Sequence, residues 1–232
     1  MSDFWHLHGL DWLEELSDAE TARVLRVSSS REHTRGETVF EPTKQPRSVY
    51  LLERGLVRIY RLSPQGDEAT LGYVRPGEVF GELGAFSSQP RESFAQSVRP
   101  SHVLRVPREE LRRILDDHPR IALCVTKQIG NRFKRIESRV ESLVFRNLRS
   151  RVSHILLELA EDFGRDEAGA QLIDLSLSQQ DVATLVGATR QSVNLCLREL
   201  REAKLVHYRS RRFVLPDPAA LRREAGVEDA LG

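Results

Sequence analysis

Two short apolar patterns on either side of one glycine restrict the fold of this chain more than any other feature. In the segment LSQQDVATLVGATRQSVNLCLREL, residues 177 to 200, Ser178 is placed to cap a helix, with Asp181 at the reciprocal capping position. Gly187 falls where a tight turn between helices requires positive φ, and Thr189 can cap a second helix. The segment therefore predicts two short helices joined by a glycine turn.

The second of these helices has an apolar side and a polar side with different uses. Arg190, Gln191 and Asn194 lie at its start, on the side away from the apolar residues, where a helix in a major groove presents base-reading groups. Arginine pairs bidentately with guanine, and asparagine or glutamine pairs with adenine. The apolar side is expected to consist of Val193, Leu195 or Cys196, Leu197 and Leu200.

The segment KLVHYRSRRFVLP, residues 204 to 216, predicts a β-hairpin whose turn is basic and suited to phosphates. Residues 176 to 215 hold seven Lys or Arg and three acids, whereas the whole chain has a formal charge of +1. Such a local surplus favours nucleic-acid binding over a merely solvated helical hairpin. The predicted DNA contacts are Ser178, Gln179, Thr189, Arg190, Gln191, Ser192, Asn194, Arg209, Arg211 and Arg212.

The N-terminal half has the pattern of an antiparallel sheet domain. From about residue 36 to 106, the short apolar or alternating runs SVYLLE, LVRIYRL, EATLGYV and HVLRVP are separated by glycines. Gly66 in SPQGDE is suited to a hairpin turn. Before this region, Ser17 and Glu20 form the capping-box pattern of a short helix.

A helical pattern replaces the sheet pattern between about residues 108 and 145, with a break at His118 and Pro119. The second helix has an apolar stripe with gaps of three and four residues, typical of a two-stranded seam. The stripe either packs on the chain's own sheet domain or joins two copies of the chain, and its narrowness favours the homodimer. The predicted seam residues are Ile129, Phe133, Ile136, Val140 and Leu143. A further helix, a loop and the short strand QLIDL are expected between this stripe and residue 176.

Several classes of protein are not expected. The start of the chain lacks a signal peptide, and no apolar run reaches 18 residues, so we expect a cytoplasmic protein without a membrane partner. Cys124 and Cys196 follow no metal or redox spacing, so no metal is expected. His6, His8, His33 and His102 are candidate haem ligands, but lone histidines are more typical of the surface, so no cofactor is expected. No catalytic motif was found, so an enzyme is not expected.

The motif GEVFGELGAF, residues 77 to 86, the long helix and the segment LSQQDVATLVGATRQSVNLCLREL, in this order, resemble the Crp/Fnr superfamily of bacterial transcription regulators. The resemblance covers roughly residues 10 to 215. It implies an α+β fold in which residues 1–117 form a jelly-roll sensor domain of the cyclic-nucleotide-binding type, 118–146 a dimerisation helix and 147–232 a winged helix-turn-helix domain. It also implies a homodimer on palindromic double-stranded DNA, and contact with RNA polymerase.

The resemblance further implies a ligand pocket in the sensor domain. In members that bind cyclic AMP, a GELG-type turn surrounds the phosphate and ribose, and an Arg-Ser pair contacts the phosphate. The corresponding positions here are Gly81, Glu82, Leu83, Gly84, Arg91, Glu92, Ser93, Ile136 and Glu137.

This chain departs from the family pattern in the pocket. With the shorter loop common in the family, Arg91 takes the arginine position and Glu92 takes the serine position. With a longer loop, Glu92 takes the arginine position and Ser93 keeps the serine position. A carboxylate near a bound phosphate costs several kcal/mol unless it turns outward. Ile136 and Glu137 also replace the family's Thr-Ser adenine contacts, so activation by cyclic AMP is not expected. Either the pocket is closed by its own ion pairs, or it takes a different nucleotide such as cyclic di-GMP.

The recognition helix departs from the family pattern too. Gln191 stands where many members have glutamate, and Leu195 where the best-known member has a second arginine, whereas Arg190 matches. Glutamate accepts a hydrogen bond from cytosine, whereas glutamine preferentially pairs with adenine. The predicted half-site therefore differs from the family's TGTGA-like consensus.

Overall fold

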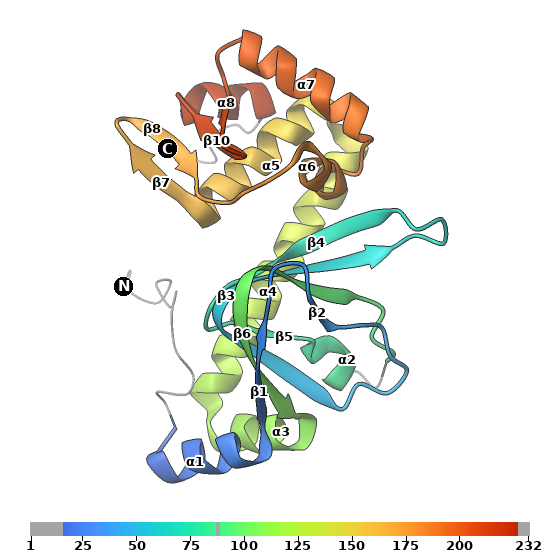
Figure 1. Cartoon of the computed structure of the whole chain (residues 1–232), viewed down its shortest axis with the longest axis vertical. Coiled ribbons are helices and arrows are strands. Elements are labelled where there is room, and N and C mark those ends of the chain that lie inside the picture. Colours follow the sequence, from blue (N-terminus) through green and yellow to red (C-terminus); the bar gives the residue numbers. More distant parts are fainter. Residues whose placement is uncertain (1–15, 87–88, 227–232) are drawn as a thin grey trace. The chain divides into compact units, whose positions relative to one another are not determined.

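The structure is a computed structural model in which residues 16 to 86 and 89 to 226 are described. The chain divides into two compact units, with the division between Lys134 and Arg135. Each unit is described by itself below, with the elements labelled as in Figure 1.

The N-terminal unit is a β roll with short helices. Its strands are β1 (Ser29–His33), β2 (Thr38–Phe40), β3 (Ser48–Leu62), β4 (Glu68–Val74), β5 (Val79–Phe80) and β6 (Phe94–Pro107). They pair antiparallel in the order β1-β6-β3-β4, with β2 on β6 and β5 on β3. Its helices are α1 (Asp18–Val27), α2 (Glu82–Phe86), α3 (Arg108–Asp117) and the first part of α4 (Pro119–Phe145). The predicted sheet domain and the helix break at Pro119 are confirmed.

Strand β3 runs through the centre of the roll and is buried on both faces. Because side chains alternate along a strand, Val49 and Leu51 join a core with residues of α1, α3 and α4. Tyr50 and Leu52 point to the other face, into a second core that includes Phe40 and Phe80. The sequence pattern indicated two runs, SVYLLE and LVRIYRL, whereas the structure joins them into one strand.

Gly55 makes this long strand possible. It has φ +101°, and a Cβ atom there would lie 2.4 Å from the Ser101 hydroxyl oxygen. The pairing of β3 with β6 shifts register on either side of it. A glycine therefore lets β3 bend where another residue would end the strand.

The predicted capping box at the start of the chain's described part is present. The Ser17 side chain accepts a hydrogen bond from the Glu20 amide, and the Glu20 carboxylate accepts one from the Ser17 amide at 2.9 Å. Two N–H groups at the start of α1 are satisfied in this way, as the sequence predicted.

The C-terminal unit contains the rest of α4 and a small helical domain with one sheet. Its further elements are α5 (Leu148–Phe163), β7 (Gly164–Glu167), β8 (Ala170–Ile173), α6 (Gln179–Val186), α7 (Arg190–Glu202), β9 (His207–Arg209), β10 (Arg212–Leu215) and α8 (Pro218–Ala225). The sheet order is β7-β8-β10-β9. The prediction of a loop before QLIDL was wrong for residues 164 to 167, which form β7 and pair with β8.

The fold is α+β, as predicted, with a β roll, a long helix and a helical domain that carries a two-stranded wing. Within residues 16–86 and 89–226, no helix is both long and apolar enough to cross a membrane. In the same ranges, no group of three or more His, Cys, Asp or Glu side chains is arranged to hold a metal ion. His6 and His8 lie outside the described residues.

Candidate nucleic-acid interface and ligand pocket

Helices α6 and α7 form the predicted helix-turn-helix, and local hydrogen bonds fix both of their starts. The Ser178 hydroxyl accepts a hydrogen bond from the Asp181 backbone amide at 3.1 Å. In return, the Asp181 carboxylate accepts one from the Ser178 backbone amide at 2.6 Å. The Thr189 hydroxyl accepts from the Ser192 amide at 3.2 Å. Gly187 ends α6 with φ +63°. Each of these positions was predicted from the sequence.

Helix α7 buries one side and exposes the other. Val193, Cys196 and Leu200 are buried, whereas Leu195 is 49% exposed, which settles the alternative in favour of Cys196. The exposed side carries Arg190, Gln191, Ser192 and Asn194. Within the described residues, no salt bridge involves Arg190. This side of α7 therefore presents guanidinium and amide groups to solvent, the groups that read base edges.

The predicted wing is present as β9, β10 and a two-residue turn. Ser210 and Arg211 both have positive φ, 51° and 63°, as a type I′ hairpin turn requires. Arg209 pairs with Glu167 of β7 at 2.8 Å, and Arg212 pairs with Asp174 at 3.1 Å. Arg211 is exposed and has no salt bridge within residues 16–86 and 89–226.

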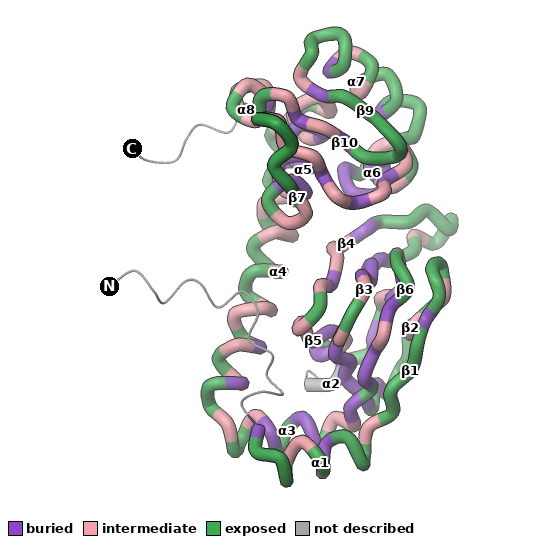
Figure 2. Tube along the Cα trace, turned by 60° about the vertical axis from the view of Figure 1, so that its left-hand side comes forward, coloured by how far each residue is buried: buried purple, intermediate pink, exposed green. Residues whose placement is uncertain are grey.

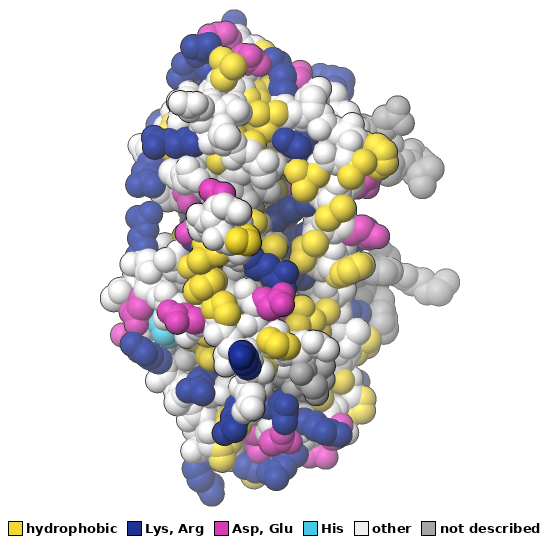
Figure 3. Space-filling model, turned by 90° about the vertical axis from the view of Figure 1, so that its right-hand side faces the viewer, with side chains coloured by type: hydrophobic (Ala, Val, Ile, Leu, Met, Phe, Trp, Pro, Cys, Tyr) yellow, Lys and Arg dark blue, Asp and Glu magenta, His cyan; other side chains and the backbone are white. Residues whose placement is uncertain are grey.

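These ion pairs connect the wing to the β7–β8 hairpin. The Arg209–Glu167 pair is exposed, and because such pairs contribute only about 0–1 kcal/mol, a phosphate can compete for Arg209. Arg212 is held by Asp174, whose side chain is only 13% exposed. Figure 3 shows Lys and Arg side chains on the surface of the C-terminal unit, with acidic side chains among them. Among the residues that the structure describes, the wing therefore offers Arg211 without a salt bridge and Arg209 in an exposed one.

The GELG turn follows β5 in the N-terminal unit: Gly81 separates the strand from α2, and Glu82, Leu83 and Gly84 begin α2. Gly81 has φ +73°, and the Glu82 side chain is almost completely buried. Glu82 accepts a hydrogen bond from Arg132 of α4 at 3.0 Å, and Arg132 also donates to the Val79 carbonyl at 3.0 Å. The turn is thus joined to the long helix by a charged contact that the sequence did not indicate.

Arg91 is buried, with 6% of its surface exposed. Its Nη2 atom donates to the carbonyls of Ser48 and Gly81, both at 2.8 Å, and its guanidinium lies 4.2 Å from the centre of the Phe40 ring. Burial lowers the pKa of Arg91. Its Nε atom is buried and has no hydrogen-bond partner among the described residues.

Glu92 points away from this guanidinium. It is exposed and forms an ion pair with Arg61 of β3, which is also exposed. The sequence left the orientation of Glu92 open, and in the structure its carboxylate turns outward to Arg61. Arg91 and Glu92 do not pair with each other: Glu92 pairs with another base, Arg61, while Glu82 pairs with Arg132.

The remaining predicted pocket residues are spread over both units. Leu83 is 63% exposed, and Ser93 is half-buried. A Cβ atom on Gly84 would lie 2.9 Å from the Pro46 ring, so this glycine permits a close approach. Ile136, half-buried, and Glu137, exposed, lie on α4 in the C-terminal unit, and their part in a pocket stays a prediction.

The residues of the apolar stripe on α4 lie in two different environments, one partly buried and one exposed. Ile129 packs against the core of the N-terminal unit, as in the alternative that the stripe covers its own domain. Phe133, Val140 and Leu143 are exposed by 65, 54 and 50%. Figure 2 shows the second half of α4 as mostly exposed or half-buried. An exposed Phe, Val and Leu on one helix face indicate an interaction surface.

One row of polar contacts crosses the sheet and was missed by sequence reasoning. The Ser30 hydroxyl lies 2.9 Å from His102 Nε2, and His102 Nδ1 contacts the Glu53 carboxylate. The three residues lie on β1, β6 and β3, so only the strand order reveals the row. Both His102 nitrogens are engaged, which removes this residue from the candidate haem ligands.

The fold and these sites define a class of protein: a β roll with a GELG turn, a long helix and a winged helix-turn-helix. The sequence matches the cyclic nucleotide-binding domain family over residues 30–118 and the Crp-like helix-turn-helix domain family over residues 150–224. The chain belongs to the Crp/Fnr family of transcription regulators, which bind DNA and are not enzymes.

Individual relatives agree with this assignment. The chain is 33% identical to the global nitrogen regulator of Synechococcus elongatus, over 82% of this chain and 86% of the relative. It is 31% identical to the CRP-like cAMP-activated global transcriptional regulator of Mycobacterium tuberculosis, over 82 and 85% of the two chains. The solved structure of the c-di-GMP-responsive global regulator CLP of Xanthomonas campestris matches with a TM-score of 0.75 and 25% identity, over 87 and 100% of the chains.

Proposed function

We propose that this regulator acts as a homodimer that binds a two-fold symmetric DNA site through helix α7 of each copy. The observation that carries the proposal is the exposed polar face of α7, with Arg190, Gln191 and Asn194, in a chain whose long helix exposes Phe133 and Val140. Two copies joined along α4 would bury this apolar stripe. They would also present two α7 helices to half-sites about one helical turn apart.

Arg190 is proposed to read a guanine, and Gln191 an adenine. Ser178, Gln179, Thr189, Ser192, Arg209, Arg211 and Arg212 are proposed to hold the duplex by its backbone. Because DNA lies in the cytoplasm of bacteria, we expect the protein to act there. Contact with RNA polymerase remains a prediction.

Selection from randomised duplex DNA by purified, nucleotide-free protein tests this function. We expect a palindrome to be enriched, and Arg190→Ala to lose roughly 1–3 kcal/mol of discrimination at one base pair of each half-site. Analytical ultracentrifugation of the wild type and of Phe133→Glu/Val140→Glu tests the seam. If Arg190→Ala prefers its site as strongly as the wild type, the assignment of Arg190 is wrong.

We further propose that this DNA binding does not need cyclic AMP. The two charged groups at the GELG turn already have protein partners. Glu82, within the turn, pairs with Arg132, and Arg91, beside the turn, donates hydrogen bonds to two carbonyls. The positions of the family's adenine contacts hold Ile136 and Glu137. Glu92 has no part in this proposal, because its carboxylate is exposed and pairs with Arg61.

A specific observation favours a second candidate, a regulator gated by a different nucleotide such as cyclic di-GMP. Arg91 Nε is buried beside the GELG turn and lacks an acceptor among the described residues, and a guanidinium with an unused donor is suited to a phosphate oxygen. Gating requires two states of the protein, one with high and one with low affinity for DNA, and a nucleotide that binds one of them more tightly than the other. Repeating the selection with cyclic AMP, cyclic GMP and cyclic di-GMP separates the candidates: equal enrichment without them supports the ungated regulator, and dependence on one supports gating.

A further inference from the structure

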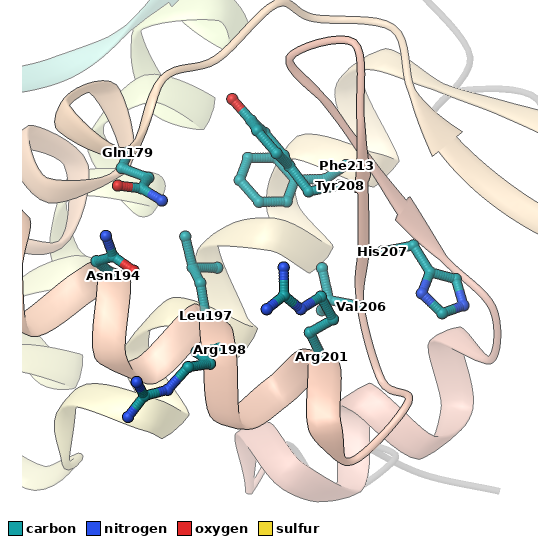
Figure 4. Close-up of a pocket in the computed structure, with 9 residues that line it drawn as sticks. All are labelled: Gln179, Asn194, Leu197, Arg198, Arg201, Val206, His207, Tyr208 and Phe213. Carbon is teal, nitrogen blue, oxygen red and sulfur yellow. The ribbon is translucent and has the colours of Figure 1, made fainter.

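A small cleft lies in the C-terminal unit between helix α7 and the wing strands, beyond the residues assigned above to base reading. Its volume is about 100 Å³. Arg198, Arg201 and Leu197 line it from α7, and Tyr208 and Phe213 line it from the wing (Figure 4). Asn194 stands at its edge beside the base-reading residues. Because Asn194, Arg198 and Arg201 are spaced by four and three residues, they share one face of α7.

The cleft is positively charged. None of its lining residues is an aspartate or glutamate. Arg201 is exposed and forms no salt bridge within the part of the chain that the structure describes. Arg198 lies 3.9 Å from Glu202, and both side chains are more than half exposed, so this pair is weak. The cleft therefore attracts an anion.

The floor of the cleft is apolar and rigid. Phe213 is buried, and its ring lies 4.8 Å from that of Tyr208. The Tyr208 hydroxyl donates to the Leu177 carbonyl at 2.7 Å, which fixes the ring. In Figure 4 the Arg201 guanidinium lies between Leu197 and Val206, while the His207 ring points away from the other side chains. An occupant must therefore combine an apolar face with a negative charge.

Size decides which occupant fits. Pockets for small-molecule ligands typically measure about 300–1,000 Å³, so a cleft of about 100 Å³ is too small for a whole nucleotide effector. One deoxyribose-phosphate unit has a carbon-rich sugar face and one negative charge. The cleft is also continuous with the face of α7 that carries Arg190 and Asn194, so the backbone of the same duplex would reach it.

We propose that this cleft binds one sugar-phosphate unit of the DNA strand, with Arg201 and Arg198 on the phosphate and Leu197 and Tyr208 against the deoxyribose. The proposal rests on the proposed DNA-binding function and extends it beyond the first turn of α7. Arg201 then fixes how deeply the recognition helix enters the groove, and it contributes affinity that does not depend on sequence.

The salt dependence of DNA binding by full-length Arg201→Gln tests the proposal. Each lost phosphate contact lowers the slope of log affinity against log salt by about 0.9, so a dimer loses about 1.8. Between 50 and 200 mM salt, the wild type should then lose about 12-fold more affinity than the variant. Arg201→Lys should keep the wild-type slope. Arg223→Gln removes the same charge from the exposed face of α8, away from the cleft, and should also keep it.

A second measurement locates the phosphate that Arg201 contacts. Wild-type protein is titrated onto duplexes in which one phosphate at a time is replaced by a neutral methylphosphonate. Neutralising any contacted phosphate should lower the slope for the wild type, and at one such position in each half-site the slope of Arg201→Gln should stay unchanged.

Three outcomes are distinguishable. A uniform loss of affinity across sequences with a reduced slope supports the proposal. An unchanged slope, or a loss confined to the preferred sequence, overturns it while the regulator still binds DNA. If the wild type selects no DNA at all, the proposed function itself has failed.

Discussion

The ion pair between Glu82 and Arg132 offers a stringent test of how the GELG turn is held. The Glu82 side chain is 3% exposed and that of Arg132 is 22% exposed. In Arg132→Met, the Glu82 carboxylate keeps its charge but loses its partner at 3.0 Å. Leaving one buried charge unpaired costs about 3–5 kcal/mol, and the partial exposure of Arg132 places the expected loss near the lower limit, about 3 kcal/mol.

Removing both charges should cost less than removing one. In Glu82→Gln/Arg132→Met neither charge of this pair remains, and the loss falls to that of ordinary hydrogen bonds, about 1–2 kcal/mol. The two substitutions should therefore be non-additive by at least about 1 kcal/mol in a double-mutant cycle.

Urea unfolding followed by circular dichroism measures these free energies, with the transition of the C-terminal unit as an internal reference. With a slope of about 2 kcal/mol per molar urea, Arg132→Met should move the N-terminal midpoint down by about 1.5 M. Lys134→Met removes an exposed charge two residues away and should change stability by less than about 0.5 kcal/mol. Equal effects of the Arg132 and Lys134 substitutions, or additivity in the cycle, would refute the reasoning.

Three further predictions concern single residues. The side-chain hydrogen bond from Ser17 is the main cause that lowers the pKa of Glu20 from 4.5 to about 2, so the stability it contributes is present above pH 4.5 and is lost as pH falls through about 2. Ser17→Ala should raise this pKa in a carbon-detected NMR titration. Burial raises the pKa of Cys196 to about 11, so iodoacetamide at pH 8 should modify it no faster than the domain opens, as followed by mass spectrometry. Gly187→Ala should cost about 1–2 kcal/mol in thermal unfolding, because Gly187 has φ +63°.

The features that the sequence predicted well are governed by residues close together in the chain. The capping boxes at Ser17 and Ser178, the turn at Gly187 and the start of α7 at Thr189 each involve groups within three or four residues of one another. Such contacts are set by side-chain type and spacing alone. The wing turn was likewise predicted from neighbouring residues. Its two positive φ values belong to Ser210 and Arg211, although a glycine is the usual residue at such positions.

The features that sequence reasoning missed depend on contacts between distant residues. Nothing in the sequence around Arg132 indicates a partner, and only the folded roll brings it to Glu82, 50 residues earlier. Glu167, the partner of Arg209, lies in β7, a strand that was not expected, and Asp174, the partner of Arg212, directly follows β8. No local pattern distinguishes a solvated charge from one that a neighbouring element will pair.

The neighbouring residues Arg91 and Glu92 show where sequence reasoning fails in this chain. Alternation along RESFAQSV correctly put them on opposite faces, but it could not say which face is buried. By this alternation Phe94 shares a face with Glu92, and its bulk would favour burial of that face. Instead the guanidinium of Arg91 is buried, because two carbonyls and the Phe40 ring satisfy it, while Arg61 holds Glu92 at the surface. The charge whose hydrogen bonds the fold can supply is the one that becomes buried, and those partners come from three different strands and loops.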